Sequence, residues 1–180
     1  METYMNDLNL MLDFETLGVD VDSVIVSIGA CLFTKDKVTE TFYQTVDLDD
    51  QIAKGRNVSG NTIKWWLKQG DAAKEPFYVI SKPLENVMSQ FTRWITYHCI
   101  DVNKLKVWGN GFDVAMAENA IKQSGLTVQW NFRNVRCMRT FKEWVANDAG
   151  YYKVQGTAHN ALDDAINQAN YIIKHSKGKL

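Results

Sequence analysis

The chain has 180 residues, of which 46% are hydrophobic and 23% are charged. This composition excludes a disordered chain, a collagen and a coiled coil, and the length suits one domain spanning residues 1–180. The formal net charge is −1, but residues 1–50 carry 11 acidic and 2 basic side chains, whereas the remainder carries 10 acidic and 18 basic ones. Such a division suits a metal site beside a phosphate-binding surface. On charge alone, an unevenly charged, solvated surface is the favoured explanation.

The cellular compartment is suggested by the cysteines and the apolar segments. Three cysteines cannot all pair internally, and their spacing fits no zinc module, which favours a reducing compartment. No apolar run approaches the roughly 18–20 residues of a membrane helix, and the N-terminus lacks the basic segment of a signal peptide. We therefore expect a protein of the cytoplasm with no membrane partner.

The first part of the chain predicts three strands in an antiparallel meander. Apolar and polar side chains alternate over residues 7–15. Residues 24–33 form a nearly unbroken apolar run, as in a strand covered on both faces. Residues 40–46 are rich in β-branched and aromatic side chains, and turn-forming residues separate the three segments.

The rest of the chain predicts helices interrupted by short strands. Proline at position 83 opens a long helix, whose apolar residues recur at helical spacing, and Gly125 ends a later one. The predicted helices are 61–69, 83–98, 112–124, 137–148 and 160–174; the predicted strands are 105–108 and a strand or extended segment within 126–136. This order favours one α/β domain with a mixed sheet.

The first candidate site residues are Asp13 and Glu15, in the first predicted strand. Two positions apart on a strand, both carboxylates project to the same face, and the neighbouring Leu12 and Phe14 indicate that the strand is buried. Like charges about 5 Å apart repel by roughly 3 kcal/mol at an effective dielectric constant near 20. A bound divalent cation would offset that cost. The alternative is an exposed acidic strand end.

The second candidate is Asp113, which begins a predicted helix after the turn Gly109-Asn110-Gly111. Apolar residues at helical spacing lie on the same face of the helix as Asp113. Asp113 is therefore the first residue of the core-facing side, at the positive end of the helix dipole. The glycines permit close approach of the backbone to a ligand or to another strand. The alternative is a first-turn aspartate that only stabilises the dipole.

The third candidates lie at the start of the last predicted helix. Asn160 has the residue type of an N-cap, which places His159 just outside the helix and free to point into a cleft. The helical wheel puts neither Asp163 nor Asp164 on the apolar face and does not choose between them. The alternative for His159 is a histidine without a chemical role.

Together these segments supply four carboxylates and one histidine, which are Asp13, Glu15, Asp113, Asp164 and His159. Hard oxygen ligands select Mg²⁺ or Mn²⁺ over zinc. Two such ions about 4 Å apart can clamp the attacking and leaving oxygens of an in-line phosphoryl displacement. A histidine beside them can take the proton from the attacking water.

Three motifs in chain order resemble those of the DEDDh 3′→5′ exonucleases. They are Asp13-Phe14-Glu15-Thr16, Phe112-Asp113 and His159-x-Ala161-x-x-Asp164. The His-x4-Asp spacing is that of the histidine subclass, because the tyrosine subclass would have a tyrosine where Asn160 stands. The resemblance spans nearly the whole chain and selects Asp164 over Asp163, which we expect to face solvent. It implies the ribonuclease H-like fold, with a mixed sheet of about five strands flanked by helices.

Further segments are similar to one group of these enzymes, which comprises phage exonuclease A, exodeoxyribonuclease VIII-like proteins and mycobacterial-type exoribonucleases. The similar segments are 61–66, 108–111 and 136–140. Members of that group often have extra residues between their Gly-Asn-Gly and Phe-Asp sequences. Here the two are adjacent, so the loop before Asp113 is short.

The resemblance implies a role for each motif residue. Asp13, Glu15 and Asp164 would hold the metal that activates water. Asp13 would also bridge to a second metal held by Asp113, and His159 would be the general base. The cofactors would be two Mg²⁺ or Mn²⁺ ions, and the product a 5′-mononucleotide released from a 3′ end.

Candidate substrate contacts surround the motifs. Trp65 or Trp66 is a candidate for stacking on a terminal base, a contact worth roughly 1–3 kcal/mol. Adjacent helical residues point about 100° apart, so we expect one tryptophan in the core and the other at the substrate. The remaining candidates are Phe14 and Leu17 as wedges at the terminal bases, with Thr16, Asn110 and Arg139.

Three arginines, Arg133, Arg136 and Arg139, recur at every third position. That spacing would line up contacts to successive phosphates. Exposure to solvent or a subunit interface would explain it equally well.

The expected activity is a metal-dependent 3′→5′ exonuclease that acts on single-stranded nucleic acid. DNA is slightly favoured over RNA on the phage-like features. One alternative is an exoribonuclease that trims RNA or short oligoribonucleotides, and the other is a catalytically silent binding module on the same fold. The expected partners are 3′ ends of single-stranded DNA or RNA, and a homodimer is compatible with the resemblance.

Overall fold

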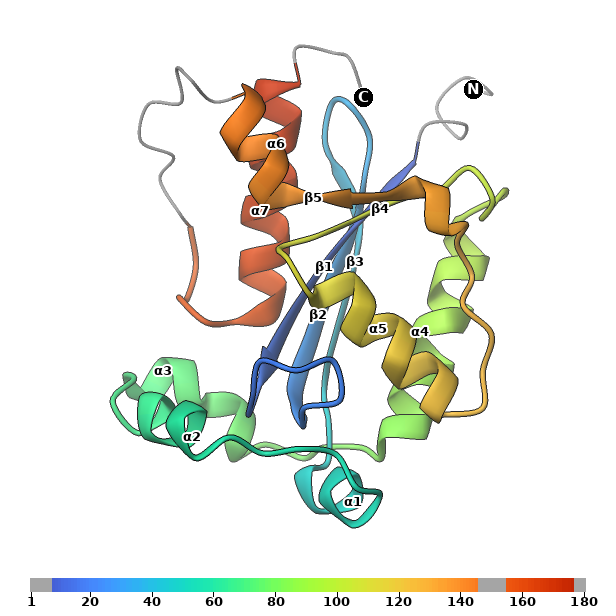
Figure 1. Cartoon of the computed structure of the whole chain (residues 1–180). Helices are drawn as coiled ribbons and strands as arrows, with labels where there is room; N and C mark the ends of the chain where they lie inside the picture. Colours follow the sequence, from blue (N-terminus) through green and yellow to red (C-terminus); the bar gives the residue numbers. More distant parts are fainter. Residues whose placement is uncertain (1–7, 146–154, 177–180) are drawn as a thin grey trace.

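The computed structural model describes residues 8–145 and 155–176, and a mixed five-stranded sheet lies at its centre (Figure 1). The strand order is β3-β2-β1-β4-β5, so β1 is the central strand and β3 and β5 form the edges. This arrangement confirms the predicted α/β class, with a mixed sheet flanked by helices.

The first three strands form the predicted antiparallel meander. They are β1 (Asn9–Thr16), β2 (Ile25–Phe33) and β3 (Val38–Thr45). Every residue of β1 and β2 is buried, because helices cover both faces of these strands. Within the β1–β2 register, Asp13 is opposite Gly29 and Glu15 is opposite Ser27. Paired residues share a face, so both carboxylates project on the same side as Gly29 and Ser27.

The other two strands are short and run parallel to β1. They are β4 (Lys106–Gly109) and β5 (Val135–Cys137). Only two residues of the segment 126–136, which was predicted as a strand or an extended segment, belong to β5. The reason is local: Asn131 accepts the backbone N–H of Arg133 and caps a single 3₁₀ turn, η2 (Phe132–Asn134), which interrupts the extended chain.

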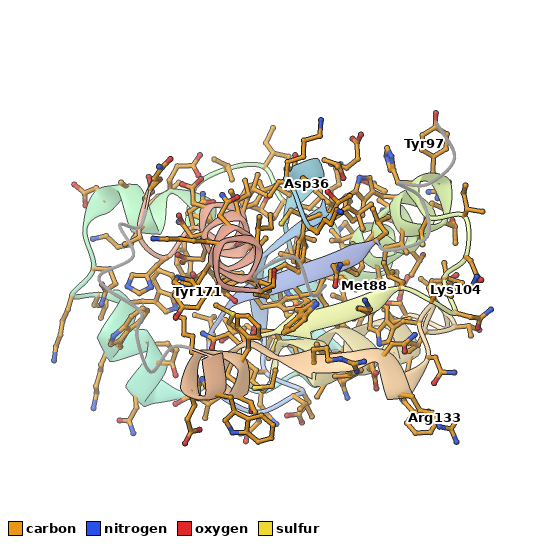
Figure 2. The ribbon with its side chains drawn as sticks, turned by 90° about the horizontal axis from the view of Figure 1, so that it is seen from above. Asp36, Met88, Tyr97, Lys104, Arg133 and Tyr171 are labelled. Carbon is orange, nitrogen blue, oxygen red and sulfur yellow. The ribbon has the colours of Figure 1, made fainter. Side chains whose placement is uncertain are left out.

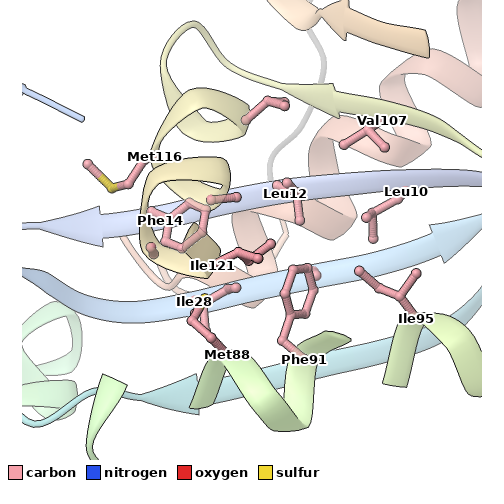
Figure 3. Packing of buried hydrophobic residues seen from close by; sticks show 14 of the residues in the cluster. Leu10, Leu12, Phe14, Ile28, Met88, Phe91, Ile95, Val107, Met116 and Ile121 are labelled. Carbon is pink, nitrogen blue, oxygen red and sulfur yellow. The ribbon is translucent and has the colours of Figure 1, made fainter. Parts of the chain in front are cut away.

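Helices cover the two faces of the sheet (Figure 1). On one side lie α4 (Leu84–His98) and α5 (Asp113–Gln123), and on the other lie α6 (Met138–Val145) and α7 (Ala161–His175). Even-numbered residues of β1 pack with α4 and α5: Leu12 and Phe14, for example, belong to the cluster that contains Phe91 (Figure 3). On the other face, Met11 packs with Ala165 of α7.

The short helices are less well predicted than the long ones. The first tryptophan-bearing helix, α2 (Gly60–Trp66), ends three residues before the predicted limit. No element was predicted where the structure has α1 (Leu48–Ala53), α3 (Asp71–Lys74) and the 3₁₀ turn η1 (Glu75–Phe77) that follows α3. The predicted helix 137–148 corresponds to α6, and its last three positions lie outside the described residues.

The start of α7 rests directly on the backbone of β2. A Cβ atom at Gly29 would collide with the backbone of Ala161 and Leu162, so only glycine permits this approach. Since Gly29 lies beside Asp13 in the sheet, the contact brings the first turn of α7 next to the carboxylates of β1.

Among residues 8–145 and 155–176, each helix is too short or too polar to cross a lipid bilayer.

Candidate active site

The five motif residues line one cavity of about 420 Å³. It opens where the carboxyl ends of the parallel strands β1 and β4 meet the first turns of α5 and α7. The lining residues are Asp13, Phe14, Glu15, Asn110, Phe112, Asp113, Met138, Arg139, Lys142, His159, Asp164, Asn167, Gln168 and Tyr171. Segments from distant parts of the chain therefore line one cavity.

Asp113 is placed by the short loop between β4 and α5. Its carboxylate accepts the backbone N–H of Asn110 at 2.6 Å, and this bond closes the loop. Gly111 has a φ of +95°, a conformation that a residue with a side chain rarely adopts. The Asn110 side chain also accepts Nε of Arg139 at 3.2 Å, which ties the loop to α6. Asp113 thus reaches the cavity although the loop is short.

His159 and Asp164 are presented by the start of α7. Asn160 is the N-cap, as predicted, and its side chain accepts the backbone N–H groups of Leu162 and Asp163. His159 lies just before the helix with a φ of +62°. Its imidazole offers a ligand atom within 4.8 Å of carboxylate oxygens of Glu15 and Asp164.

Asp163 lies outside the cavity lining, as predicted, but it is half-buried and not fully exposed to solvent. Its carboxylate accepts the backbone N–H of Thr157 at 2.8 Å and packs against Gly156. The sequence analysis missed this contact because neither the motif spacing nor the helical wheel takes account of N–H donors in the preceding loop.

Burial raises the pKa of all four carboxyl groups in the cavity. The pKa of Glu15 rises to about 8 through desolvation and the charges of Asp164 and Asp113. That of Asp113 rises to about 6 through desolvation, opposed by the Asn110 N–H. Burial also raises the pKa values of Asp13 and Asp164. The cavity therefore holds protons near neutral pH that a bound cation would displace.

The raised pKa of Glu15 predicts a pH-dependent stability in the absence of metal. Between its ordinary value of 4.5 and about 8, the folded state binds more protons than the unfolded state. The stability that Glu15 contributes is complete below 4.5 and is lost as the pH rises through about 8. In EDTA, we expect Glu15→Gln to become increasingly more stable than the parent as the pH rises through this window. Urea unfolding of both proteins across the window measures the difference, and a constant difference would contradict the assignment.

Gln168 is a cavity residue that the sequence analysis missed. Its amide Nε2 donates to Oδ1 of Asp13 at 2.7 Å. It lies one helical turn after Asp164 and therefore on the same face of α7, which was the available signal. The hydrogen bond favours the ionised form of Asp13 and fixes one of its two oxygens.

The two tryptophans divide as predicted into a core residue and a surface residue. Trp66 is buried and donates its indole N–H to the carbonyl of Thr16 at 2.8 Å. Trp65 is 41% exposed, and its ring meets the imidazole of His159 edge to face with the centroids 4.8 Å apart. Trp65 is thus the tryptophan beside the cavity.

The other candidate substrate residues are distributed unevenly. Phe14, Asn110 and Arg139 line the cavity, although the Phe14 side chain is largely buried. Leu17 packs in a separate cluster with Trp66. The Thr16 hydroxyl donates to the carbonyl of Gly18 at 2.6 Å, and neither Thr16 nor Leu17 lines the cavity.

Of the three regularly spaced arginines, Arg139 alone belongs to the cavity lining. Arg133 points outward at the periphery of the molecule (Figure 2), with its guanidinium 4.8 Å from the ring centre of Phe132. Arg136 donates to the carbonyls of Arg133 and Val135. The spacing therefore does not produce a row of phosphate contacts along one face.

The donor set fits a hard divalent cation. Four carboxyl groups from β1, α5 and α7 meet in one cavity, where burial raises the pKa of each; the charges of the neighbouring cavity carboxylates further raise the pKa values of Asp13 and Glu15. Oxygen ligands of this kind suit Mg²⁺ and Mn²⁺, whose charge relieves that repulsion.

A family model matches residues 8–175, and its description is the 3′-5′ exoribonuclease Rv2179c-like domain. The chain belongs to the Rv2179c-like family. The matched residues thus include both the acidic strand β1 and the helix α7, which contribute residues to the cavity. A search of curated protein sequences gives no match.

Solved structures of DEDD-type exonucleases share the ribonuclease H-like fold of this Rv2179c-like chain. Cell-death related nuclease 4 (CRN-4) is 16% identical with a TM-score of 0.55; the match covers 95% of this chain and 64% of that one. Pop2p of S. pombe, in a Mg²⁺- and Mn²⁺-bound form, is 14% identical with a TM-score of 0.62 and coverages of 96% and 83%. Exonuclease I of E. coli, in complex with a 5cy-dT13 oligonucleotide, is 11% identical with a TM-score of 0.63 and coverages of 96% and 41%.

The chain therefore spans less than two thirds of the length of CRN-4 and less than half that of exonuclease I. At these identities the likeness establishes the fold, and the family match establishes the class, a 3′-5′ exonuclease domain.

Proposed function

We propose that residues 1–180 form one exonuclease domain of the DEDDh type, which removes 5′-mononucleotides from the 3′ end of single-stranded nucleic acid. The observation that carries the proposal is the meeting of four carboxyl groups and His159 in one cavity. A binding module would have no use for such a cluster, because concentrated acids repel one another and lower the stability of the fold.

Two Mg²⁺ or Mn²⁺ ions are the proposed cofactors. Asp13, Glu15 and Asp164 would hold one ion, and Asp13 and Asp113 the other. Cations held by these residues would polarise a water molecule and would stabilise the charge on the scissile phosphate. Gln168 keeps one Asp13 oxygen in place by its hydrogen bond, which leaves the other oxygen free for a cation.

His159 is the proposed general base. Its imidazole lies at the rim of the acidic cluster, within 4.8 Å of Glu15 and Asp164. A neutral imidazole at this position can take the proton of a water that attacks phosphorus and pass it to solvent.

The substrate contacts that we propose are those beside the cavity. Trp65 presents a half-exposed indole next to His159, where a terminal base can stack on it. Arg139 and Asn110 line the cavity, where they can bind phosphate and sugar oxygens. Phe14 also lines the cavity.

The family description favours RNA as the substrate, in place of the slight preference for DNA expected from the sequence. DNA is the second candidate, because exonuclease I, which shares this fold, is described in complex with a dT13 oligonucleotide. Discrimination would rest on contacts to the 2′-hydroxyl of the terminal sugar. The proposed setting is the cytoplasm, and a homodimer is compatible with the proposal.

One assay tests the activity, its metal requirement and its sugar preference together. RNA and DNA oligomers of one sequence, labelled at the 5′ end, are incubated with the protein and Mg²⁺, Mn²⁺ or EDTA. We expect ladders that shorten from the 3′ end with either metal, faster shortening of RNA, and no cleavage in EDTA. Undiminished cleavage in EDTA would exclude the metal mechanism, and faster shortening of DNA would reverse the preference.

A further inference from the structure

The turn that carries His159 is fastened at both ends to the first two turns of α7. Residues 157–160 form a β-turn in which the backbone N–H of Asn160 donates to the carbonyl of Thr157 at 3.2 Å. Its fourth residue, Asn160, is the N-cap of α7. Its first residue, Thr157, donates its N–H to Asp163 at 2.8 Å. His159 lies between these two attachments.

The conformation of His159 explains why the turn needs support. Its φ of +62° lies in the left-handed region, which a β-turn of type II requires at its third position and which glycine or asparagine adopts more readily. A histidine there persists only when the surrounding contacts determine the backbone. Asp163 supplies such a contact by accepting the N–H of Thr157. Without this hydrogen bond, the turn would relax toward a negative φ and carry the imidazole away from the cavity.

Asn167, one helical turn after Asp163, also binds the backbone of the segment before α7. Its Oδ1 accepts the N–H of Gln155 at 3.0 Å, and its Nδ2 donates to the carbonyl of Gln155 at 2.7 Å. Asp163 and Asn167 are separated by four residues and therefore share one side of α7. Together they hold residues 155–157 along the helix.

We infer that Asp163 and Asn167 are positioning residues, which hold the His159 turn so that its imidazole faces the metal-binding carboxylates. This inference rests on the proposed role of His159 as the general base. It gives the two adjacent acids different tasks: Asp164 lines the cavity, whereas Asp163 accepts a backbone N–H outside it. Asp163 acts through its ability to accept a hydrogen bond, and its charge is dispensable.

Two substitutions at position 163 separate these properties. Both Asp163→Ala and Asp163→Asn remove the charge, but asparagine retains an oxygen that can accept the Thr157 N–H. We expect Asp163→Ala to lower kcat by about 10- to 100-fold, as a misplaced catalytic group does, with little change in KM. We expect Asp163→Asn to stay within about threefold of the parent and so to report rescue by the conservative variant. Calorimetric binding of Mn²⁺ should be equal in the two variants.

A double-mutant cycle shows whether Asp163 acts through His159. When His159 is already alanine, we expect the further change Asp163→Ala to lower kcat by less than about twofold, because the positioned group is gone. Asn167→Ala provides a second probe, with the same expected loss of kcat and the same unchanged Mn²⁺ binding, in case Asp163→Ala fails to fold.

Equal losses in Asp163→Ala and Asp163→Asn would overturn the inference, because they would assign the effect to charge. Full additivity with His159→Ala would overturn it as well, because Asp163 would then act independently of the base. If His159→Ala itself leaves kcat unchanged, the proposed function loses its general base and the positioning role falls with it. The inference is supported if kcat falls in Asp163→Ala but not in Asp163→Asn, and if Asp163→Ala causes no further loss of kcat when His159 is already alanine.

Discussion

Replacement of Asp13 by asparagine should abolish cleavage and leave the metal-free protein at least as stable as the parent. Asparagine keeps the shape of the side chain and can still accept the amide of Gln168, but it removes a charge that burial and three neighbouring carboxyl groups disfavour. Relief of that repulsion is expected to stabilise the metal-free fold, a trade between stability and activity that is common at functional sites. Asp164→Asn should behave in the same way.

Thermal melting with EDTA and with Mg²⁺ measures both parts of this prediction. Mg²⁺ should stabilise the parent by about 2.7 kcal/mol at a concentration one hundred times its dissociation constant. Each asparagine variant should gain less, because it has lost a ligand. Asp163→Asn is the matched control, since it removes one carboxylate next to the cavity without altering its lining. A variant that melts well below the parent in EDTA would identify its aspartate as structural, and a metal-induced shift equal to that of the parent would show that it is no ligand.

Substitution of His159 by alanine should lower kcat by roughly 10²- to 10⁴-fold, the usual contribution of a general base. The fold and most of the metal binding should persist, because four carboxyl groups remain in the cavity. The pH–rate profile should lose the limb that reports the ionisation of the imidazole. These results would place the protein in the histidine subclass.

His98 provides the matched control for this substitution. It lies at the end of α4, on the other face of the sheet, and its Nδ1 is 4.0 Å from Glu40. His98→Ala should therefore leave kcat and the pH–rate profile unchanged. Near-normal turnover of His159→Ala would show that His159 has no catalytic role.

The long elements could be predicted from the sequence because their signals are local. Alternation marks β1, a continuous apolar run marks β2, and helical spacing of apolar residues marks α4. The helix α1 has no such pattern over its six residues. It is held instead by Gln51, whose amide exchanges hydrogen bonds with the backbone of Ile25, a contact that only the folded chain makes.

The motif residues that meet in the cavity could be predicted from the sequence, but the contacts that hold them in place could be predicted only in part. The resemblance of three motifs to those of DEDDh exonucleases identified the five residues that meet there, although they are up to 151 positions apart. The supporting contacts of Gln168 and Asp163 were not foreseen, because each joins a side chain to a group that the fold brings near. Periodicity indicates which face of a helix is buried, but it does not indicate what lies opposite.

Because Gly29 has no side chain, α7 packs close against the sheet. This close distance determines how long the acidic side chains of the cavity need to be. An aspartate carboxylate lies only one methylene from its Cα, so aspartates of a sheet and of a helix can share one ion only if the two layers approach closely. Side chains between the layers would hold them apart, and glutamates would then have to bridge the gap. Because α7 rests on Gly29, directly beside Asp13, the short side chain of Asp164 would suffice to reach the ion that we propose it shares with Asp13. Short acids have fewer rotamers to lose when a cation binds, so close packing of the layers also lowers the entropic cost of ordering the ligands.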